Sequence, residues 1–536
     1  WKAAFQALLQ IQINLMIWHC SSSLHKMHSE AHKSRGRWSV FILCLGLVIF
    51  GTNLARIGAS YNSDGLIKYI QAYSLASSRF HSEELHYPGK FLDPEYKLYP
   101  FRAQYLLQFD GRNLGQYPLV FSVLMALPVT LLPPASIPFL CLGVAFLTLL
   151  VYWRVFKPSP IVLAYATFAT PMITQSMELT EGPFVLLAGL GGLHFFIRAI
   201  EGGTIRDAAL AGFFSALGVW LRLEALLYSV SLLAAWILIS RKTIGTRHYM
   251  AFAIAAGLVF ASFMLFNFWD YGHPLGTRFI ANLSEPKPGV GPIERITQTI
   301  TLVFGWKMKL GFFGYSPLLI VPAVYFAFAN RDNTTTRILL LFLAGFLLVA
   351  GMIAPNDGIV TWGSRYMALA LFPALLLLDR FLKLQIQQKG KLRNALFLCG
   401  LAYSVVLSFI TLSIQRHASK DQSSIQGEIE STNGDVVIFP SQLLSSYSGL
   451  YYFKKPIFAV WNPEQMRDLV MAIKAHRPMR VSFVEYSGWT AREFATALQV
   501  EFGQDKIPAY LQSLAAFKTL ETHKGKHLTI HEFVTE

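Results

Sequence analysis

The sequence predicts an all-α, polytopic membrane domain followed by a small α/β domain. Of the 536 residues, 53% are hydrophobic and only 14% are charged, whereas soluble domains carry roughly 25% charged residues. Apolar runs close to the length of a membrane span recur between residues 40 and 415. From about residue 416 the composition changes sharply, and short apolar runs alternate with polar stretches. Lipid is therefore the expected solvent for most of the chain.

The apolar cores predict about eleven spans, because a span needs about 20 mainly apolar residues and each core can extend at its ends. In chain order they are Val40–Leu54, Ile137–Tyr152, Ile161–Thr174, Phe184–Phe196, Ala208–Trp220, Ala225–Ile239, Ala251–Phe268, Leu318–Phe328, Ile338–Ile353, Met367–Leu378 and Ala395–Leu412.

Two apolar stretches do not read directly as single membrane spans. Tyr117–Leu132 contains Pro118 and Pro128 and is interpreted as a helix along the membrane edge. Ala208–Ile239 could form one long helix broken at Arg222 or two helices joined by a tight turn. The alternation of basic loops favours two helices.

Basic residues in short loops predict the orientation, because Lys and Arg concentrate on the cytoplasmic side. Basic residues precede the first predicted span, so its start is expected inside, and every second short loop after it is again basic. The outer segment Asp270–Gly311 breaks this pattern with five basic residues. That excess suggests an anionic ligand.

These observations divide the chain into three predicted parts. Residues 1–37 form an N-terminal cytoplasmic or interfacial segment, and residues 38–415 form the membrane domain with an extracytoplasmic loop over 56–116. Residues 416–536 form an extracytoplasmic α/β domain, because runs such as Val436–Phe439 alternate with helix-like polar stretches.

The formal charge of +15 does not predict nucleic-acid binding, because the basic residues fall between apolar runs rather than in one patch. The four cysteines show neither zinc-ligand spacing nor a disulfide framework. No metal ion or other cofactor is expected.

Ionisable residues near membrane depth are functional candidates, because their burial in lipid is costly. The sequence places most of them at the outer ends of the predicted spans. They are Asp64, Glu178, Glu181, Arg222, Glu224, Arg278 and Arg365.

A carboxylate can act as a general base toward a hydroxyl, and arginines suit phosphate through paired hydrogen bonds. Structural alternatives stay open: Asp64, Glu178 and Glu181 could cap helices, and Arg222 could pair with Glu224. Arg278 and Arg365 could bind lipid headgroups, and Trp362 and Tyr366 could anchor the interface.

Several segments, in order, resemble the GT-C superfamily of membrane glycosyltransferases. Tyr61–Tyr73 resembles the start of their first outer loop, where Asp64 matches a catalytic Asp. Five short motifs over residues 115–366 match in the same order: G-Q-Y-P-L from Gly115, L-T-E-G-P from Leu179, L-R-L-E from Leu221, F-F-G-Y-S-P from Phe312 and W-G-S-R-Y from Trp362.

The resemblance covers roughly residues 40–415 and implies inverting transfer of a sugar from a polyprenyl-phosphate donor to a hydroxyl acceptor. Asp64 would be the base, and Arg222, Arg278 and Arg365 would compete to hold the donor phosphate. Sugar or acceptor contacts are expected from Glu181, Glu178, Glu224, Tyr117, Tyr315 and Trp362. A lone Asp64, where many relatives have paired acids, argues against a metal-dependent mechanism.

The expected partners are the lipid-linked sugar donor, membrane lipid, and a glycan, lipid or protein acceptor. The expected location is a bacterial inner membrane, with the active site and the C-terminal domain facing the periplasm. Two rivals stay open: a lipid-linked sugar flippase or transporter, and a non-catalytic assembly subunit. A transporter predicts internal repeats and polar sites at the membrane midplane, which this sequence lacks.

Overall fold

The helices of the computed structural model coincide with the predicted apolar runs. The structure describes residues 31–57, 61, 63–241, 245–284, 291–306, 309–328, 333–356, 363–386, 391–476, 478–487 and 504–535. The predicted N-terminal segment lies mostly outside these residues. Each of the eleven predicted spans overlaps a helix: α2 (Ala31–Ile57), α6 (Ile137–Phe156), α7 (Pro160–Phe168), α9 (Gly182–Ile200), α10 (Ile205–Leu217), α11 (Glu224–Ser240), α12 (Thr246–Tyr271), α16 (Ile320–Phe328), α17 (Thr334–Ile353), α18 (Leu371–Ile386) and α19 (Lys391–Glu430).

Six helical stretches in the described part of the chain are long and apolar enough to cross a membrane. They are Gly36–Ile57, Pro134–Phe156, Gly182–Ile200, Thr246–Tyr271, Thr334–Ile353 and Phe397–Glu430. The chain is therefore an integral, multi-pass membrane protein. The count of eleven spans stays a prediction, because α11 and the stretch Pro317–Phe328 are shorter apolar helices.

Three predicted runs differ in detail from a continuous α-helix. The run Ile161–Thr174 is divided into α7 and α8 (Pro171–Gln175), because a proline that begins a helix has no amide for the preceding turn. The runs that begin at Leu318 and Met367 open as 3-10 turns, η3 (Pro317–Leu319) and η4 (Arg365–Ala370). Ala208–Ile239 forms two helices, α10 and α11, as the basic-loop alternation favoured.

The chain divides into two compact units, and each is described by itself. The first comprises Trp1–Arg56, Pro138–Phe266 and Lys287–Ile414. Small residues let its helices pack closely: a Cβ on Gly192 of α9 would lie 2.7 Å from the backbone nitrogen of Ser215 on α10. A Cβ on Gly212 would lie 2.2 Å from the carbonyl oxygen of Phe252 on α12. Such close contact between backbones is the usual way that helices associate in lipid.

The second unit comprises Ile57–Ile137, Asn267–Pro286 and Gln415–Glu536. Its first segment contains α3 (Ser63–Ser77), α4 (Arg102–Tyr105), the hairpin β1 (Leu106–Phe109) and β2 (Arg112–Gly115), and α5 (Leu119–Leu131). The helix α5 occupies the stretch predicted to lie along the membrane edge. Its second segment contains α13 (Gly276–Ser284).

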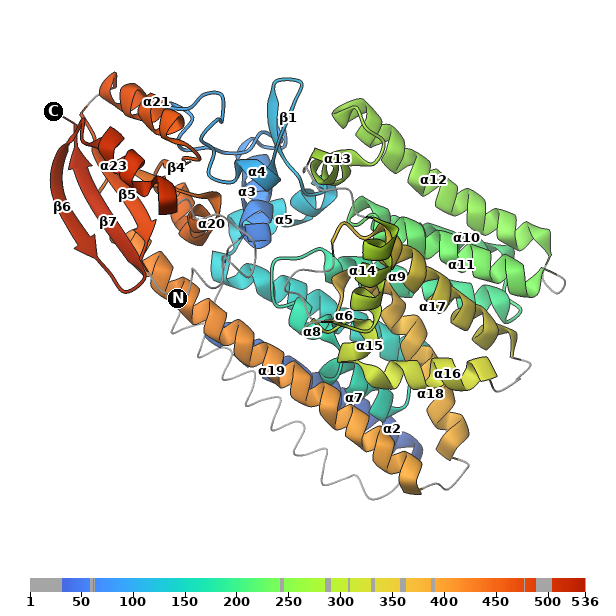
Figure 1. Ribbon diagram of the computed structural model, residues 1–536. Helices are drawn as coiled ribbons and strands as arrows, with labels where there is room; N and C mark the ends of the chain where they lie inside the picture. The colour runs from blue at the N-terminus through green and yellow to red at the C-terminus, as the bar shows by residue number, and fades with distance from the viewer. Residues whose placement is uncertain are drawn as a thin grey trace. The chain divides into compact units, whose positions relative to one another are not determined.

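The tail forms the predicted α/β domain. Its sheet has the order β4–β3–β5–β7–β6, with β3 parallel to β4 and β5 and the remaining pairs antiparallel (Figure 1). The strands are β3 (Val436–Phe439), β4 (Ile457–Ala459), β5 (Arg480–Tyr486), β6 (Lys518–Lys524) and β7 (Leu528–Val534). The helical segments are α20 (Gln442–Ser445), η5 (Ser446–Phe453), α21 (Pro463–Lys474), η6 (Gln504–Lys506) and α23 (Ile507–Leu514).

The first loop and the tail are joined inside the second unit. The amide of Ala459, at the end of β4, donates to the carbonyl oxygen of Leu98 over 3.0 Å. The hydroxyl of Ser445 donates to the carbonyl oxygen of Pro100 over 2.6 Å. These contacts support the prediction that the loop and the tail lie on the same side of the membrane.

Candidate functional site

Asp64 lies in the first turn of α3 and is half-buried. A carboxylate in this position is stabilised by the partial positive charge of the helix N-terminus. The hydroxyl of Tyr105, at the end of α4, donates a hydrogen bond to Asp64 Oδ1 over 3.2 Å. The structure thus fixes the candidate base from two segments of the first loop.

Tyr117 lies beside this pair, and its backbone is held by Gln71 of α3. Gln71 Nε2 donates to the carbonyl oxygen of Tyr117 over 3.0 Å, and the Tyr117 amide donates to Gln71 Oε1 over 3.1 Å. The ring of Tyr117 stacks near that of Tyr105, with centroids 6.5 Å apart. A Cβ on Gly115 would lie 2.2 Å from the Gln71 side chain, so the Gly115 position suits glycine.

Two cations lie against the ring of Tyr117. Lys68 Nζ is 4.7 Å from the ring centroid, and Arg278 Cζ is 5.0 Å from it. Lys68 is one helical turn after Asp64 on α3, and only 5% of its surface is exposed. Cations over an aromatic face gain from the ring quadrupole, but two of them at one ring repel each other. Among the described residues, the ring thus brings two positive side chains close to the Asp64 carboxylate, and cations of this kind can bind an anion such as phosphate.

The same surroundings keep the phenol of Tyr117 protonated. Burial, and after it the negative charge of Asp64, raise the pKa of Tyr117 well above its usual range. The neutral hydroxyl is buried beside the Asp64 carboxylate. It is a potential hydrogen-bond donor beside the carboxylate.

The loop segment that contributes Arg278 is also fixed locally. The hydroxyl of Thr277 donates to the carbonyl oxygen of Gln116 over 3.1 Å, which places α13 beside Tyr117. Gly276 has a φ of +74°, and a Cβ there would lie 2.3 Å from Asn267 Oδ1. Only glycine takes this turn without strain.

The first unit contains a second charged cluster, centred on Arg222 at the break between α10 and α11. Arg222 Nη2 lies 2.6 Å from Glu224 Oε1, and Arg222 Nη1 lies 3.2 Å from Glu181 Oε1. At most a fifth of each of the three side chains is exposed. Both carboxylates pair with the Arg222 guanidinium, so its hydrogen-bond donors are already engaged by Glu181 and Glu224.

Arg365 belongs to this second cluster through Tyr366. The Tyr366 ring centroid is 5.4 Å from Arg365 Cζ and 6.0 Å from Arg222 Cζ, and its hydroxyl donates to Asn356 Oδ1 over 3.0 Å. The preceding turn is tight: Gly363 has a φ of +84°, and a Cβ there would lie 2.4 Å from the side chain of Pro171.

The remaining predicted site residues fall outside both clusters or outside the described residues. Glu178 is exposed in the turn before α9. Tyr315 is fully buried, and its hydroxyl donates to Ser408 Oγ over 3.0 Å, so it packs α15 (Phe312–Tyr315) on α19. Trp362 lies outside the described residues. Their roles in binding stay predictions.

Sequence reasoning missed Lys68 and Tyr105. Lys68 could have been found from its spacing. It follows Asp64 by four residues, and residues four apart on a helix lie on the same face. Tyr105 carried no such signal, since its contact with Asp64 spans 41 residues. Within the described residues, no group of three or more His, Cys, Asp or Glu side chains could hold a metal ion.

The fold is that of a membrane protein with a helical domain and a small C-terminal sheet domain, and it is similar to the fold of solved ArnT structures. The chain resembles ArnT from Cupriavidus metallidurans in the apo state, with a TM-score of 0.51 and 10% identity over 92% of this chain and 97% of that one. The structure of the same ArnT bound to undecaprenyl phosphate gives a TM-score of 0.46 and 9% identity, over 92% of this chain and 98% of that one. No protein-family model and no curated protein sequence matches the chain.

Proposed function

We propose that this protein is a GT-C glycosyltransferase that moves a sugar from a polyprenyl-phosphate donor to a hydroxyl acceptor, with inversion. The observation that carries the proposal is the carboxylate of Asp64 beside a ring flanked by Lys68 and Arg278. The likeness of the fold to that of ArnT supports it.

In this reaction the acceptor oxygen attacks the anomeric carbon, and the bond from that carbon to the phosphate oxygen breaks. Asp64 accepts the proton of the acceptor hydroxyl as the new glycosidic bond forms. The hydrogen bond from Tyr105 orients the carboxylate for this proton transfer. The electron pair leaves with the polyprenyl phosphate.

The leaving group needs stabilisation of its charge more than it needs a proton, because it leaves as a phosphate. Lys68 Nζ and Arg278 Cζ lie 4.7 Å and 5.0 Å from the centroid of the Tyr117 ring. We assign the donor phosphate to this pair. The neutral hydroxyl of Tyr117 adds a donor for a phosphate or sugar oxygen.

The cluster of Arg222, Glu181 and Glu224 suits a different task. Carboxylates accept hydrogen bonds from sugar hydroxyls, and the Arg222 guanidinium is already paired with both of them. We assign Glu181 and Glu224 to sugar or acceptor hydroxyls, with Arg222 holding them in place. Arg365 is the remaining candidate for the phosphate, and Lys and Ala substitutions there will test it.

The site is proposed to lie on the periplasmic face of a bacterial inner membrane. The support is the alternation of basic loops, which puts the first loop and the tail outside. The acceptor can be a glycan, a lipid or a protein, and the sugar a hexose or a pentose.

A transfer assay tests the proposal. Purified protein in detergent receives a panel of polyprenyl-phosphate sugars, labelled in the sugar, together with an envelope fraction from the source organism as acceptor. Label that moves to a new product, with free polyprenyl phosphate released in equal amount, supports the enzyme. Movement of intact donor across vesicle membranes without cleavage would identify a flippase instead. Binding of donor with neither result would indicate an assembly subunit.

A further inference from the structure

The C-terminal domain contacts the two loop segments that hold the candidate base. The segment η5 lies between β3 and β4 in the tail, and its last residue, Phe453, packs on α3. The ring centroid of Phe453 is 4.7 Å from that of Tyr73 and 5.8 Å from that of Tyr69. Both tyrosines lie on α3, the helix that carries Asp64 in its first turn. The tail therefore packs against the middle of this helix.

A second contact lies next to the start of α3. Gly449 of η5 has a φ of +52°, and a Cβ there would lie 3.3 Å from the carbonyl oxygen of Tyr61, three residues before Asp64. The same Cβ would lie 1.8 Å from Gln426 Nε2 on α19. Here the tail approaches the backbone so closely that only glycine fits without movement.

A third contact fixes the partner of Asp64. Tyr452 of η5 packs against Phe101, with ring centroids 5.5 Å apart, and Phe101 is fully buried. The carbonyl oxygen of Phe101 accepts from the amide of Tyr105 over 3.3 Å. Tyr105, which hydrogen-bonds Asp64, is therefore connected to η5 through Phe101.

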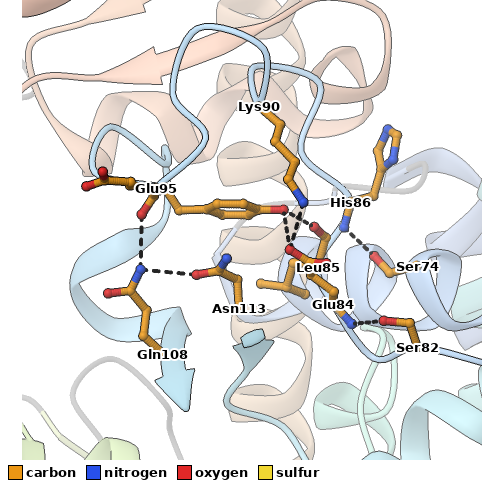
Figure 2. Close-up of polar contacts among 10 residues, drawn as sticks. Ser74, Ser82, Glu84, Leu85, His86, Lys90, Glu95, Gln108 and Asn113 are labelled. Carbon is orange, nitrogen blue, oxygen red and sulfur yellow. Dashed lines mark hydrogen bonds and ion pairs between the residues drawn. The ribbon is translucent and has the colours of Figure 1, made fainter. Parts of the chain in front are cut away.

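The loop segment that follows α3 is also hydrogen-bonded to this helix. The amide of His86 donates to Ser74 Oγ over 2.8 Å, and Lys90 pairs with Glu84 at 3.0 Å (Figure 2). The Tyr452 hydroxyl donates to the carbonyl oxygen of His86. The loop, α3 and η5 thus form one packed assembly inside the second unit.

We propose that η5 of the C-terminal domain is a positioning element for the reaction, which holds Asp64 and Tyr105 in register through Phe453 and Tyr452. The inference rests on the proposed function, because it needs Asp64 to act as the base. It gives the tail a role in turnover rather than in donor binding. A displacement of about 1 Å in a reacting group can lower a rate on the order of 100-fold.

The first measurement does not depend on activity. Amide hydrogen exchange of the full-length protein in detergent reports how often the first turns of α3 open. We expect faster exchange over residues 64–70 in Phe453→Ala, and wild-type exchange there in Phe453→Tyr, which keeps the ring. Met471→Ala, an exposed tail substitution on α21, is the matched control and should leave α3 unchanged.

The second measurement is a double-mutant cycle in the transfer assay. Phe453→Ala should lower kcat about 10-fold and leave the KM for donor within about twofold of wild type. In an Asp64→Asn background the same change should add no further loss, since there is no base left to position. A merely structural role would lower the amount of folded protein equally in both backgrounds and would not produce this non-additivity.

The outcomes separate the two proposals. Loss of transfer in Asp64→Asn together with an unchanged kcat in Phe453→Ala would overturn the positioning role alone. Unchanged exchange over residues 64–70 in Phe453→Ala would overturn it as well. Wild-type transfer by Asp64→Asn would overturn the proposed base, and the positioning role with it.

Discussion

Tyr105 donates its hydroxyl to Asp64 across 3.2 Å, although 41 residues separate the two in the chain. The bond joins the end of α4 to the first turn of α3. It restricts the rotation of the Asp64 side chain. A carboxylate held in this way is pre-organised for proton transfer.

Asp64→Asn should lower transfer on the order of 100-fold, because the amide cannot take a proton while the shape of the side chain is nearly kept. Donor affinity should stay close to wild type. Initial rates over a range of donor concentrations measure both. Tyr105→Phe is the companion variant and should lose much less, since it removes the orientation of the base but not the base. Near-normal turnover by purified Asp64→Asn would remove Asp64 from the mechanism.

Lys68→Met should weaken donor binding, because it removes a buried cation from the ring that Arg278 shares. Loss of a charge-assisted contact corresponds to roughly 10- to 100-fold in the KM for donor. Lys90→Met removes an exposed cation from the same loop and is the matched control. Equal donor kinetics in the two variants would place the phosphate elsewhere.

Arg365→Lys tests whether Arg365 binds the donor phosphate or anchors the chain at the membrane interface. A clamp uses the planar guanidinium and should not tolerate Lys, whereas a headgroup anchor needs only positive charge. If Arg365 binds the phosphate, Arg365→Lys should impair donor use nearly as much as Arg365→Ala. Wild-type donor kinetics for Arg365→Lys would make Arg365 an anchor.

Substitutions at Arg222 and Arg278 test the two other arginines that were predicted to hold the donor phosphate. Arg222→Lys should impair folding more than donor binding, because two buried carboxylates lose part of their partner. Arg278→Lys should raise the KM for donor without that loss of stability. Thermal unfolding measured beside the kinetics distinguishes the two effects.

Chelation should leave transfer intact. Lys68 and Arg278 lie close to Asp64 and repel a divalent cation from its carboxylate. Transfer rates after EDTA treatment and gel filtration should match those of untreated enzyme. A loss of activity that Mg²⁺, Mn²⁺ or Zn²⁺ restores would contradict this expectation.

Single cysteines at Ser82 and Ser431 should both react with an impermeant thiol reagent added outside intact spheroplasts, in a background without native cysteines. Both positions are exposed, and hydrogen bonds between the loop and the tail support the prediction that they lie on one side of the membrane. Arg206→Cys, in a loop predicted to be cytoplasmic, is the control and should react only after lysis. Labelling of one of the two outer positions alone would break the predicted topology.

Local sequence patterns were sufficient for the membrane helices. Hydropathy and helix formation depend on neighbours in the chain, so each apolar run, from α2 to α19, matches a helix. The break at Arg222 and the change of composition before the tail were visible for the same reason. A charged residue at the end of an apolar run, such as Asp64 or Arg278, is recognised in the sequence because burying a charge near lipid is costly.

Which of these residues share a cluster was decided only by the tertiary structure. Asp64, Tyr105, Tyr117 and Arg278 come from four segments, and their contacts depend on how those segments pack. Tertiary packing also pairs Arg222 with two carboxylates. It likewise places the tail segment η5 against α3. The sequence alone determined that this is a membrane protein with acids and arginines at the ends of its helices. The packing of distant side chains, which no local pattern encodes, decided that Asp64 lies with Lys68 and Arg278 and that the C-terminal domain supports its helix.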